Sequence, residues 1–269
     1  MRKFAIILFA VLAAACEVEK IPEHIVVDGW IEDGGYPVVI LTSSVAVVEG
    51  VMDYDDLERH VLKWATVSVS DGENNYPLMG KKDDRYFPPY IYTSYSFKGQ
   101  AGKSYTLNVK YGETEASAVT TIPAPQALTQ IAPNVTEDGS TIKVRFTPQD
   151  DSYYLFFTKR AQKDSTYMPS MYSLVDGSAV SGEYESIVFP GFHIMGSEFS
   201  WYFESGDKVS VRFCTMDRDA HAYWKAVDDQ WIFSRSPFFP VHSGAPSNVV
   251  GGYGYWAGYG TTYYDVDIP

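Results

Sequence analysis

Ala65-Thr66-Val67-Ser68-Val69 and Tyr105-Thr106-Leu107-Asn108-Val109 alternate apolar and polar side chains without interruption. Successive side chains of a β-strand point to opposite faces, so each stretch predicts a strand that buries one face. Turn signals such as Asp71-Gly72-Glu73-Asn74 separate these stretches. The pattern therefore predicts a β-sandwich of about seven short strands. We expect them at residues 25–31, 36–41, 65–70, 75–78, 92–97, 104–111 and 116–121.

A proline-rich break follows this first series of strands. Ile122-Pro123-Ala124-Pro125 carries two prolines, which disfavour helix interiors and central strands, so we expect a linker between two domains there. Strand patterns resume at 141–147, 152–159, 184–189, 197–203 and 209–215. These patterns predict an N-terminal β-sandwich domain over residues 25–122 and a second β-rich domain over residues 123–269.

One helix is predicted in the second domain, at residues 218–233. Asp217 is a suitable N-cap residue, because its carboxylate can accept hydrogen bonds from the first turn. Ala220, Trp224, Val227 and Trp231 recur at spacings of four, three and four. This spacing places the four apolar side chains on one helix face, which we expect to pack on a sheet. The predicted fold class is mainly β, with two β-sandwich domains and one α-helix in the C-terminal half.

The first sixteen residues have the form of a bacterial lipoprotein signal. Met1-Arg2-Lys3 is basic, residues 4–12 are apolar, and three alanines precede Cys16. The apolar run is shorter than the about 20 residues that span a bilayer, and small residues mark a cleavage site. We expect residues 1–15 to be a signal peptide, Cys16 to be lipidated, and residues 16–24 to be a tether. The alternative is a secreted protein in which Cys16 merely lies near the cleavage site.

The chain is strongly acidic. Its 34 Asp and Glu against 21 Lys and Arg give a formal charge of −13, or −15 once Arg2 and Lys3 are removed and 19 basic residues remain. Nucleic acid requires basic patches, so no nucleic-acid partner is expected. Binding to anionic lipid through protein charge is disfavoured for the same reason. Membrane contact is therefore expected only through the lipid anchor.

No motif in the sequence predicts catalysis or a cofactor. The five histidines lack zinc-ligand spacing, and neither a nucleophile elbow nor a phosphate-binding loop is present. Asp53-Tyr54-Asp55-Asp56 offers oxygens for calcium without EF-hand spacing, so a solvated loop is favoured. Cys214 lies in an alternating run and is interpreted as a buried thiol rather than a nucleophile. We expect no enzymatic activity, cofactor or metal; a hydrolase that uses two carboxylates is the alternative.

Aromatic residues are the remaining candidates for a binding site. The chain has 21 tyrosines, and Tyr86, Phe87 and Tyr90 lie beside prolines in one predicted loop. Trp256 lies in a C-terminal segment where glycines alternate with aromatics. Rings held in such loops can stack on sugars or anchor peptides. We predict that these four residues bind a ligand or partner, against the alternative that they pack on sheets.

Near its expected mature N-terminus the chain carries the apolar stretch Ile25-Val26-Val27-Asp28-Gly29-Trp30-Ile31. This stretch resembles the first strand of the Bacteroidota outer-membrane lipoprotein family known as domain of unknown function 4249. Residues 65–71, 102–107, 121–125 and 247–256 resemble later family segments in the same order, whereas residues 54–63 are more acidic and longer than the usual loop. The resemblance implies an immunoglobulin- or transthyretin-like first sandwich. We expect a fibronectin-like second sandwich.

The resemblance also implies a function and a location. Members are lipoproteins paired with a TonB-dependent outer-membrane transporter, and acidic residues after Cys16 resemble surface-export signals. We therefore expect a cell-surface accessory or binding subunit of a glycan or peptide uptake complex, with an adhesin or structural module as a further alternative. Asp164-Ser165-Thr166 resembles the O-glycosylation acceptor of Bacteroidota envelope proteins, which makes Ser165 a candidate modification site.

Overall fold

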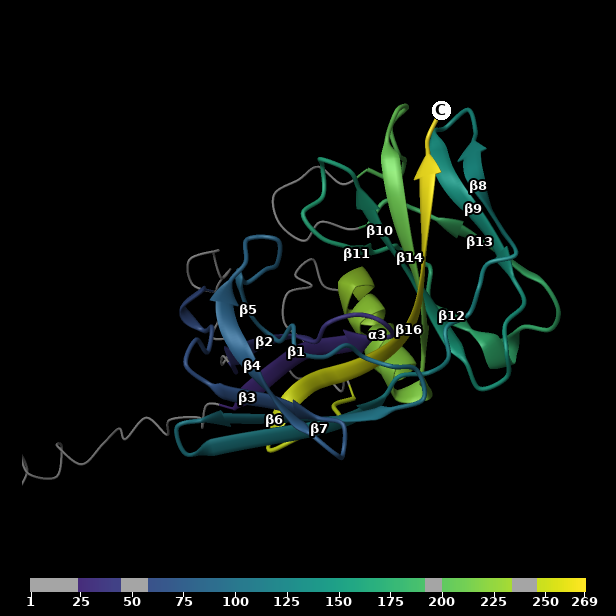
Figure 1. Cartoon of the computed structure of the whole chain (residues 1–269). Coiled ribbons are helices and arrows are strands. Elements are labelled where there is room, and N and C mark those ends of the chain that lie inside the picture. Colours follow the sequence, from purple (N-terminus) through teal and green to yellow (C-terminus); the bar gives the residue numbers. More distant parts are fainter. Residues whose placement is uncertain (1–23, 45–57, 192–199, 234–245) are drawn as a thin grey trace, which may run out of the picture.

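The computed structural model describes residues 24–44, 58–191, 200–233 and 246–269. Within these residues the chain is mainly β, with two β-sandwiches and one helix, α3 (Arg218–Phe233), which confirms the predicted fold class. Figure 1 shows the first sandwich at the lower left and the second at the upper right. The signal peptide, Cys16, most of the tether and Asp53–Asp56 lie outside the described residues. No helix among the described residues is long and apolar enough to cross a bilayer.

One large, bent sheet runs through both halves of the chain, and a small sheet completes the second half. The large sheet has the order β11 (Met168–Pro169), β10 (Tyr153–Arg160), β14 (Lys208–Met216), β16 (Gly252–Asp267), β1 (Ile25–Glu32), β2 (Val38–Ser43), β5 (Tyr90–Thr93), β4 (Asn75–Lys82), β3 (Thr66–Ser70), β6 (Ser104–Tyr111), β7 (Thr114–Thr121) and β15 (Val249–Val250). The short β12 (Val175–Asp176) pairs with β10. The small sheet has the order β13 (Tyr184–Val188), β9 (Ser140–Phe146) and β8 (Gln130–Val135).

The first sandwich forms because the large sheet bends at β4. The N-terminal half of β4 pairs with β3, and its C-terminal half pairs with β5, so one strand belongs to both layers. Inward side chains of the two layers, among them Val27, Leu41 and Leu107, make a single core. Val67 and Val69 are buried between exposed or half-buried neighbours, as the alternation in 65–69 predicts.

The second sandwich packs β10, β14 and the C-terminal half of β16 against the small sheet. Its core is rich in aromatic rings; Phe146 lies 4.8 Å from Phe213 and 4.9 Å from Tyr154, measured between ring centroids. Helix α3 starts at its predicted position, because the Asp217 carboxylate accepts a 2.8 Å hydrogen bond from the Ala220 amide. Ala220 is buried and Trp224 packs beside it on the opposite face of the large sheet.

Strand β16 belongs to both sandwiches. Its N-terminal half pairs in parallel with β1, from Ile25↔Gly252 to Glu32↔Tyr259, and its C-terminal half pairs antiparallel with β14. Residues 249–259 follow the predicted linker and were therefore predicted to belong to the second domain. In the structure they form backbone hydrogen bonds with strands of the first sandwich. Figure 1 shows β16 in yellow running from one sandwich to the other.

Glycines in β16 let the interdomain segment cross the sheet. A Cβ built at Gly258 would lie 2.7 Å from the carbonyl oxygen of Thr121, and one at Gly260 would collide with Pro123. The backbone of residues 121–125 therefore passes directly over β16, where only glycine leaves room. This contact fixes the two sandwiches against each other.

Some predicted boundaries differ from the structure. The expected strand at 92–97 occurs at Tyr90–Thr93, because residues 94–98 turn away from β2. Strand β8 was not predicted, since it contains Pro133 and lies at a sheet edge. In the predicted strand at 197–203, residues 197–199 lie outside the described part, and Phe203 makes only an isolated bridge to Ser140.

Candidate functional site

Tyr86 is half-buried on the face of the large sheet that is turned away from both sandwich cores. Its loop, residues 83–89, joins β4 to β5 and folds over this face, where the Tyr86 ring lies 6.0 Å from Trp30. The ring packs with Val38, Ile40 and Ile91 in a small apolar cluster. Burial raises the pKa of Tyr86. Phe87 is half-buried in the same loop.

Tyr90 lies on the other face, against the first core. Its hydroxyl donates a 2.9 Å hydrogen bond to the carbonyl oxygen of Lys63, and its ring meets Tyr92 edge to face at 5.6 Å. Adjacent residues of a strand point to opposite sides, so Tyr90 and Ile91 cannot share a surface. The structure therefore separates Tyr90 from Tyr86, although the sequence grouped them.

Trp256 has no exposed surface, which corrects its prediction as a ligand-binding residue. The ring lies in the core of the first sandwich, and its Nε1 donates a 3.1 Å hydrogen bond to the carbonyl oxygen of Tyr105. Its backbone is held by Asn248, whose side-chain amide makes hydrogen bonds of 2.9 and 2.8 Å with the Trp256 N–H and C=O. Trp256 is a core residue, as the packing alternative for the C-terminal segment predicts.

Ser165 is exposed and connects the two halves of the molecule. Its hydroxyl donates a 3.1 Å hydrogen bond to the carbonyl oxygen of Arg85, so the 161–167 loop of the second sandwich touches the 83–89 loop of the first. The Ser165 side chain is exposed to solvent, and the attachment of a glycan to it stays a prediction.

Cations and aromatic rings are concentrated on the face of the large sheet that carries Tyr86 and is turned away from both sandwich cores. We call it the junction face. It comprises Trp30, Glu32, Tyr36, Met79, Lys81, Arg85, Tyr86, Tyr95, Lys98, Phe157, Lys159, Tyr167, Arg212 and Tyr263. All six cation–π contacts found among the described residues lie here, with the cation 4.1 to 6.0 Å from the ring centroid. Such contacts contribute about 0.5–2 kcal/mol each, depending on their exposure.

Strand pairing explains how the exposed edge of the junction face is assembled. Lys81 pairs with Ile91 and Met79 with Thr93, so both side chains point to the same side as Ile91. The Lys81 ammonium donates a 2.8 Å hydrogen bond to the Tyr95 hydroxyl. Tyr95 meets Tyr36 edge to face at 5.0 Å, and Lys98 lies 5.1 Å from the centre of the Tyr36 ring.

Arg212 forms the buried end of the junction face. Its guanidinium lies 4.1 Å from the Phe157 ring centre and 5.3 Å from that of Tyr167. The nearest carboxylate oxygen, on Glu32, is 3.6 Å away, and Tyr263 donates a 2.7 Å hydrogen bond to the other oxygen of Glu32. Burial holds the pKa of Tyr263 well above its usual value, so the phenol stays protonated as a donor.

Three buried polar atoms near Arg212 have no hydrogen-bond partner: Arg212 Nε, Glu32 Oε2 and Thr261 Oγ1. No other such side-chain atom occurs in the part of the chain that the structure describes. The strand register places the three residues close together. Glu32 pairs with Tyr259, which precedes Thr261 by two residues on β16. Thr261 in turn pairs with Cys214, which follows Arg212 by two residues on β14. A buried polar atom without a hydrogen bond is costly, and the 3.6 Å ion pair between Arg212 and Glu32 offsets part of this cost.

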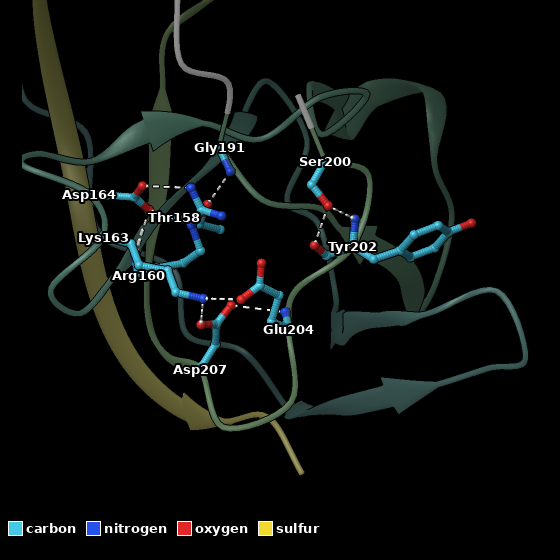
Figure 2. A network of polar contacts seen from close by, with 9 residues as sticks. All are labelled: Thr158, Arg160, Lys163, Asp164, Gly191, Ser200, Tyr202, Glu204 and Asp207. Carbon is cyan, nitrogen blue, oxygen red and sulfur yellow. Dashed lines mark hydrogen bonds and ion pairs between the residues drawn. The ribbon is translucent and has the colours of Figure 1, made fainter. Parts of the chain in front are cut away.

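Two polar networks hold the loops of the junction face in place. Asp83 accepts hydrogen bonds of 2.8 and 2.6 Å from Nε and Nη2 of Arg85, which holds the pKa of Asp83 well below its usual range. In the other loop, Figure 2 shows Arg160 facing Asp164, and the Lys163 ammonium between Glu204 and Asp207. Both loops are therefore ordered before anything binds.

Asp28 lies on the same side of β1, close to helix α3. Asp28 is exposed to solvent on one side, and the protein around its carboxylate disfavours the charge and raises the pKa of Asp28 to about 6. Tyr223 and Tyr259 are the titratable groups whose own pKa values respond to Asp28. No group of three or more His, Cys, Asp or Glu side chains suited to a metal occurs among the described residues.

The sequence indicated Tyr86 and its loop but not the rest of the junction face. Tyr36, Lys81 and the pair Tyr95 and Lys98 come from three separate segments and form no local motif. The one available signal was the alternation in β4, which places Met79 and Lys81 on one side. Arg212 gave no such signal, because it alternates with Val211 and Phe213 and therefore occupies a position that the pattern assigns to the face away from the core.

Fold and site together define a two-sandwich β protein with a shared strand and a cationic, aromatic face at the junction of its halves. The chain belongs to the family described as "Domain of unknown function (DUF4249)", whose model matches residues 14–265. No curated protein matches the chain.

Two solved structures are similar over much of the chain. A cytokine receptor complex shares 13% identity over 72% of this chain and 86% of its own, with a TM-score of 0.24. The FN1–FN3 domains of chicken CNTN1 share 9% identity over 73% of this chain and 61% of theirs, with a TM-score of 0.22.

Proposed function

We propose that this protein is a non-enzymatic lipoprotein, anchored through Cys16 to the outer membrane of a Bacteroidota cell and facing outward. In this proposal it is the accessory or binding subunit of a TonB-dependent complex that takes up a glycan or a peptide. The lipoprotein signal that ends in Cys16 and the family membership support the anchor and the location.

The geometry of β16 supports a role as a rigid, anchored arm. Ile25, the first strand residue after the tether, pairs with Gly252 at the start of β16, whereas Asp267 near its end pairs with Lys208 of the second sandwich. A strand of 16 residues has a contour length of about 50 Å at about 3.3 Å per residue, and β16 bends as it passes from one sandwich to the other (Figure 1). The second sandwich is thus held away from the anchored end.

The observation that carries the proposal is the junction face itself. It gathers the six cation–π contacts and several exposed aromatic side chains on one side of a chain whose formal charge is −13. A preordered surface of this composition suits binding, because few rotamers are lost when a ligand or partner docks.

Purification from native membranes tests the proposal. A C-terminally tagged full-length protein would be solubilised in mild detergent and analysed with its co-purifying proteins by mass spectrometry. We expect a triacylated Cys16 as the N-terminus and a TonB-dependent transporter in stoichiometric amount. The Cys16→Ala variant should lose membrane attachment. An unmodified N-terminus cut elsewhere, or recovery without any transporter, would overturn the proposal.

A further inference from the structure

We infer that the junction face is a docking surface for an acidic segment of a protein partner. The inference rests on the proposed function only for the identity of that partner. The surface itself is inferred from the exposure, composition, charge and order of one edge of the junction face. This edge comprises Met79, Lys81, Tyr95, Tyr36 and Lys98.

Exposure and composition point to a protein partner. Met79 is 72% exposed and Tyr95 is 63% exposed, although both adjoin the packed sheet. Tyrosine, methionine and arginine are enriched in the centres of protein–protein interfaces, whereas lysine and acidic residues are depleted there. Flexible methionine side chains adapt to different partner shapes. The exposed Met79, Tyr95 and Tyr36 match such an interface centre, whereas Lys81 and Lys98 match the polar rim that surrounds it.

Charge points to an acidic partner. Lys81, Arg85 and Lys98 lie along one unbroken series of contacts, and the carboxylate within it is that of Asp83, which is nearly buried and bonded to Lys81 and Arg85. Arg85 and Lys98 keep exposed side chains. At physiological ionic strength, electrostatic interactions are screened beyond about 8 Å, so an acidic segment docked here interacts with the nearby cations more strongly than with the formal charge of −13 spread over the whole chain.

The arrangement of the rings favours a peptide over a sugar. A sugar stacks on an open ring face, but Lys98 and Arg85 lie over one face of the Tyr36 and Tyr86 rings. Lys81 lies at the hydroxyl edge of the Tyr95 ring, to which it donates a hydrogen bond. Arg85 and Lys98 keep exposed side chains, and Lys81 is partly exposed although it also contacts Tyr95 and Asp83. An acidic side chain can therefore approach Arg85 and Lys98 directly and form charge-assisted hydrogen bonds with them.

The test uses the full-length, lipidated protein in native membranes. A photo-crosslinking amino acid is placed at Met79, with a matched control at Val119, which is 57% exposed on β7 of the first sandwich. In parallel, Lys81→Glu with Lys98→Glu is compared with Lys103→Glu with Lys110→Glu, a pair of exposed lysines elsewhere on the same sandwich. Thermal unfolding of each variant verifies that it folds.

We expect position 79, and not position 119, to crosslink to the co-purifying transporter at an acidic segment identified by mass spectrometry. The first lysine pair should reduce this crosslink at least tenfold and the control pair less than twofold, and 0.5 M salt should weaken it. Crosslinking from position 119 alone, or equal loss in both lysine variants, would overturn the inference while leaving the proposed function intact. Retained transporter with lost binding of an acidic oligosaccharide would also overturn it, because the face would then be a ligand site. Absence of any transporter in the wild-type sample would count against the proposed function instead.

Discussion

The indole Nε1 of Trp256 donates a hydrogen bond of 3.1 Å to the backbone carbonyl oxygen of Tyr105, across 151 residues of sequence. Both rings are fully buried in the first core. The last strand of the chain is therefore needed to complete the first sandwich, which cannot reach its final packing until β16 has joined β1.

Replacing Trp256 should destabilise the protein more than any exposed aromatic substitution. We expect Trp256→Ala to lower the free energy of unfolding by about 3–5 kcal/mol, because a large ring is lost from a packed core. Trp64 is 87% exposed, so Trp64→Ala should change it by less than about 0.5 kcal/mol. Urea unfolding measures both. A cost below about 1 kcal/mol for Trp256→Ala would contradict the packing described here.

The sequence predicted the strands that bury one face, because alternation reports burial directly. The stretch 65–69 and helix 218–233 are examples, and their positions agree with β3 and α3 to within one residue. It did not reveal the 16-residue strand β16. Gly258 and Gly260 interrupt the apolar pattern there, and their reason is the crossing backbone of residues 121–125, which no local pattern encodes.

The candidate site was predictable only in part for a related reason. Tyr86 lies in a loop whose prolines and aromatics are adjacent in sequence, so composition revealed it. Tyr36 and Tyr95, in contrast, meet only because β2 pairs with β5. The glycines and aromatics around Trp256 would look the same in sequence if its ring lay on the surface. Only the pairing of β16 with β1 places the ring in the core.

Gly258 should tolerate no side chain. Gly258→Ala would bring Cβ within 2.7 Å of the Thr121 carbonyl oxygen, a backbone atom that cannot move aside without displacing the interdomain segment. We expect a loss of more than about 2 kcal/mol in unfolding free energy. Gly34→Ala is the control. A Cβ at this position has no atom within 4 Å, and the only cost comes from the left-handed φ of +70°. We expect a loss of about 1 kcal/mol in the free energy of unfolding. Equal losses would show that the crossing segment yields.

Asp83 should stabilise the protein only above the pH at which a free aspartate ionises. Its folded pKa is lowered chiefly by the hydrogen bonds from Arg85, so its contribution is present above about pH 4 and is lost as the pH falls further. At pH 7 we expect Asp83→Asn to cost about 1–3 kcal/mol. Asp84→Asn removes an exposed ion pair to Lys82 and should cost less than about 0.5 kcal/mol. Thermal melts at pH 7 and pH 3 test this; an Asp83→Asn effect that does not shrink at pH 3 would be inconsistent with the charge-assisted bond.

Cys214 should be chemically silent in the folded protein. Its side chain is fully buried, and desolvation raises the pKa of the thiol to about 12, so little thiolate exists at pH 8. We expect no alkylation by iodoacetamide in native buffer and complete alkylation in 8 M urea. The deletion of residues 1–16 isolates Cys214 as the remaining cysteine for this measurement. Rapid modification of the native protein would mean that β14 opens on the time scale of the assay.

Asp28 should oppose folding at neutral pH. Its folded pKa of about 6 lies above the value of 3.8 for an unperturbed aspartate, so the folded state binds more protons between these two pH values. Stability therefore falls as the pH rises from about 4 to 6. The penalty is largest above pH 6, and solvent screening keeps it small because Asp28 is exposed. Asp28→Asn removes the charge, so it should raise the melting temperature at pH 7.5 and leave it nearly unchanged at pH 3.5. Asp138→Asn, in the exposed β8–β9 turn, should show no such pH dependence. A destabilised Asp28→Asn variant at pH 7.5 would instead mean that the ionised carboxylate has a favourable partner beside helix α3.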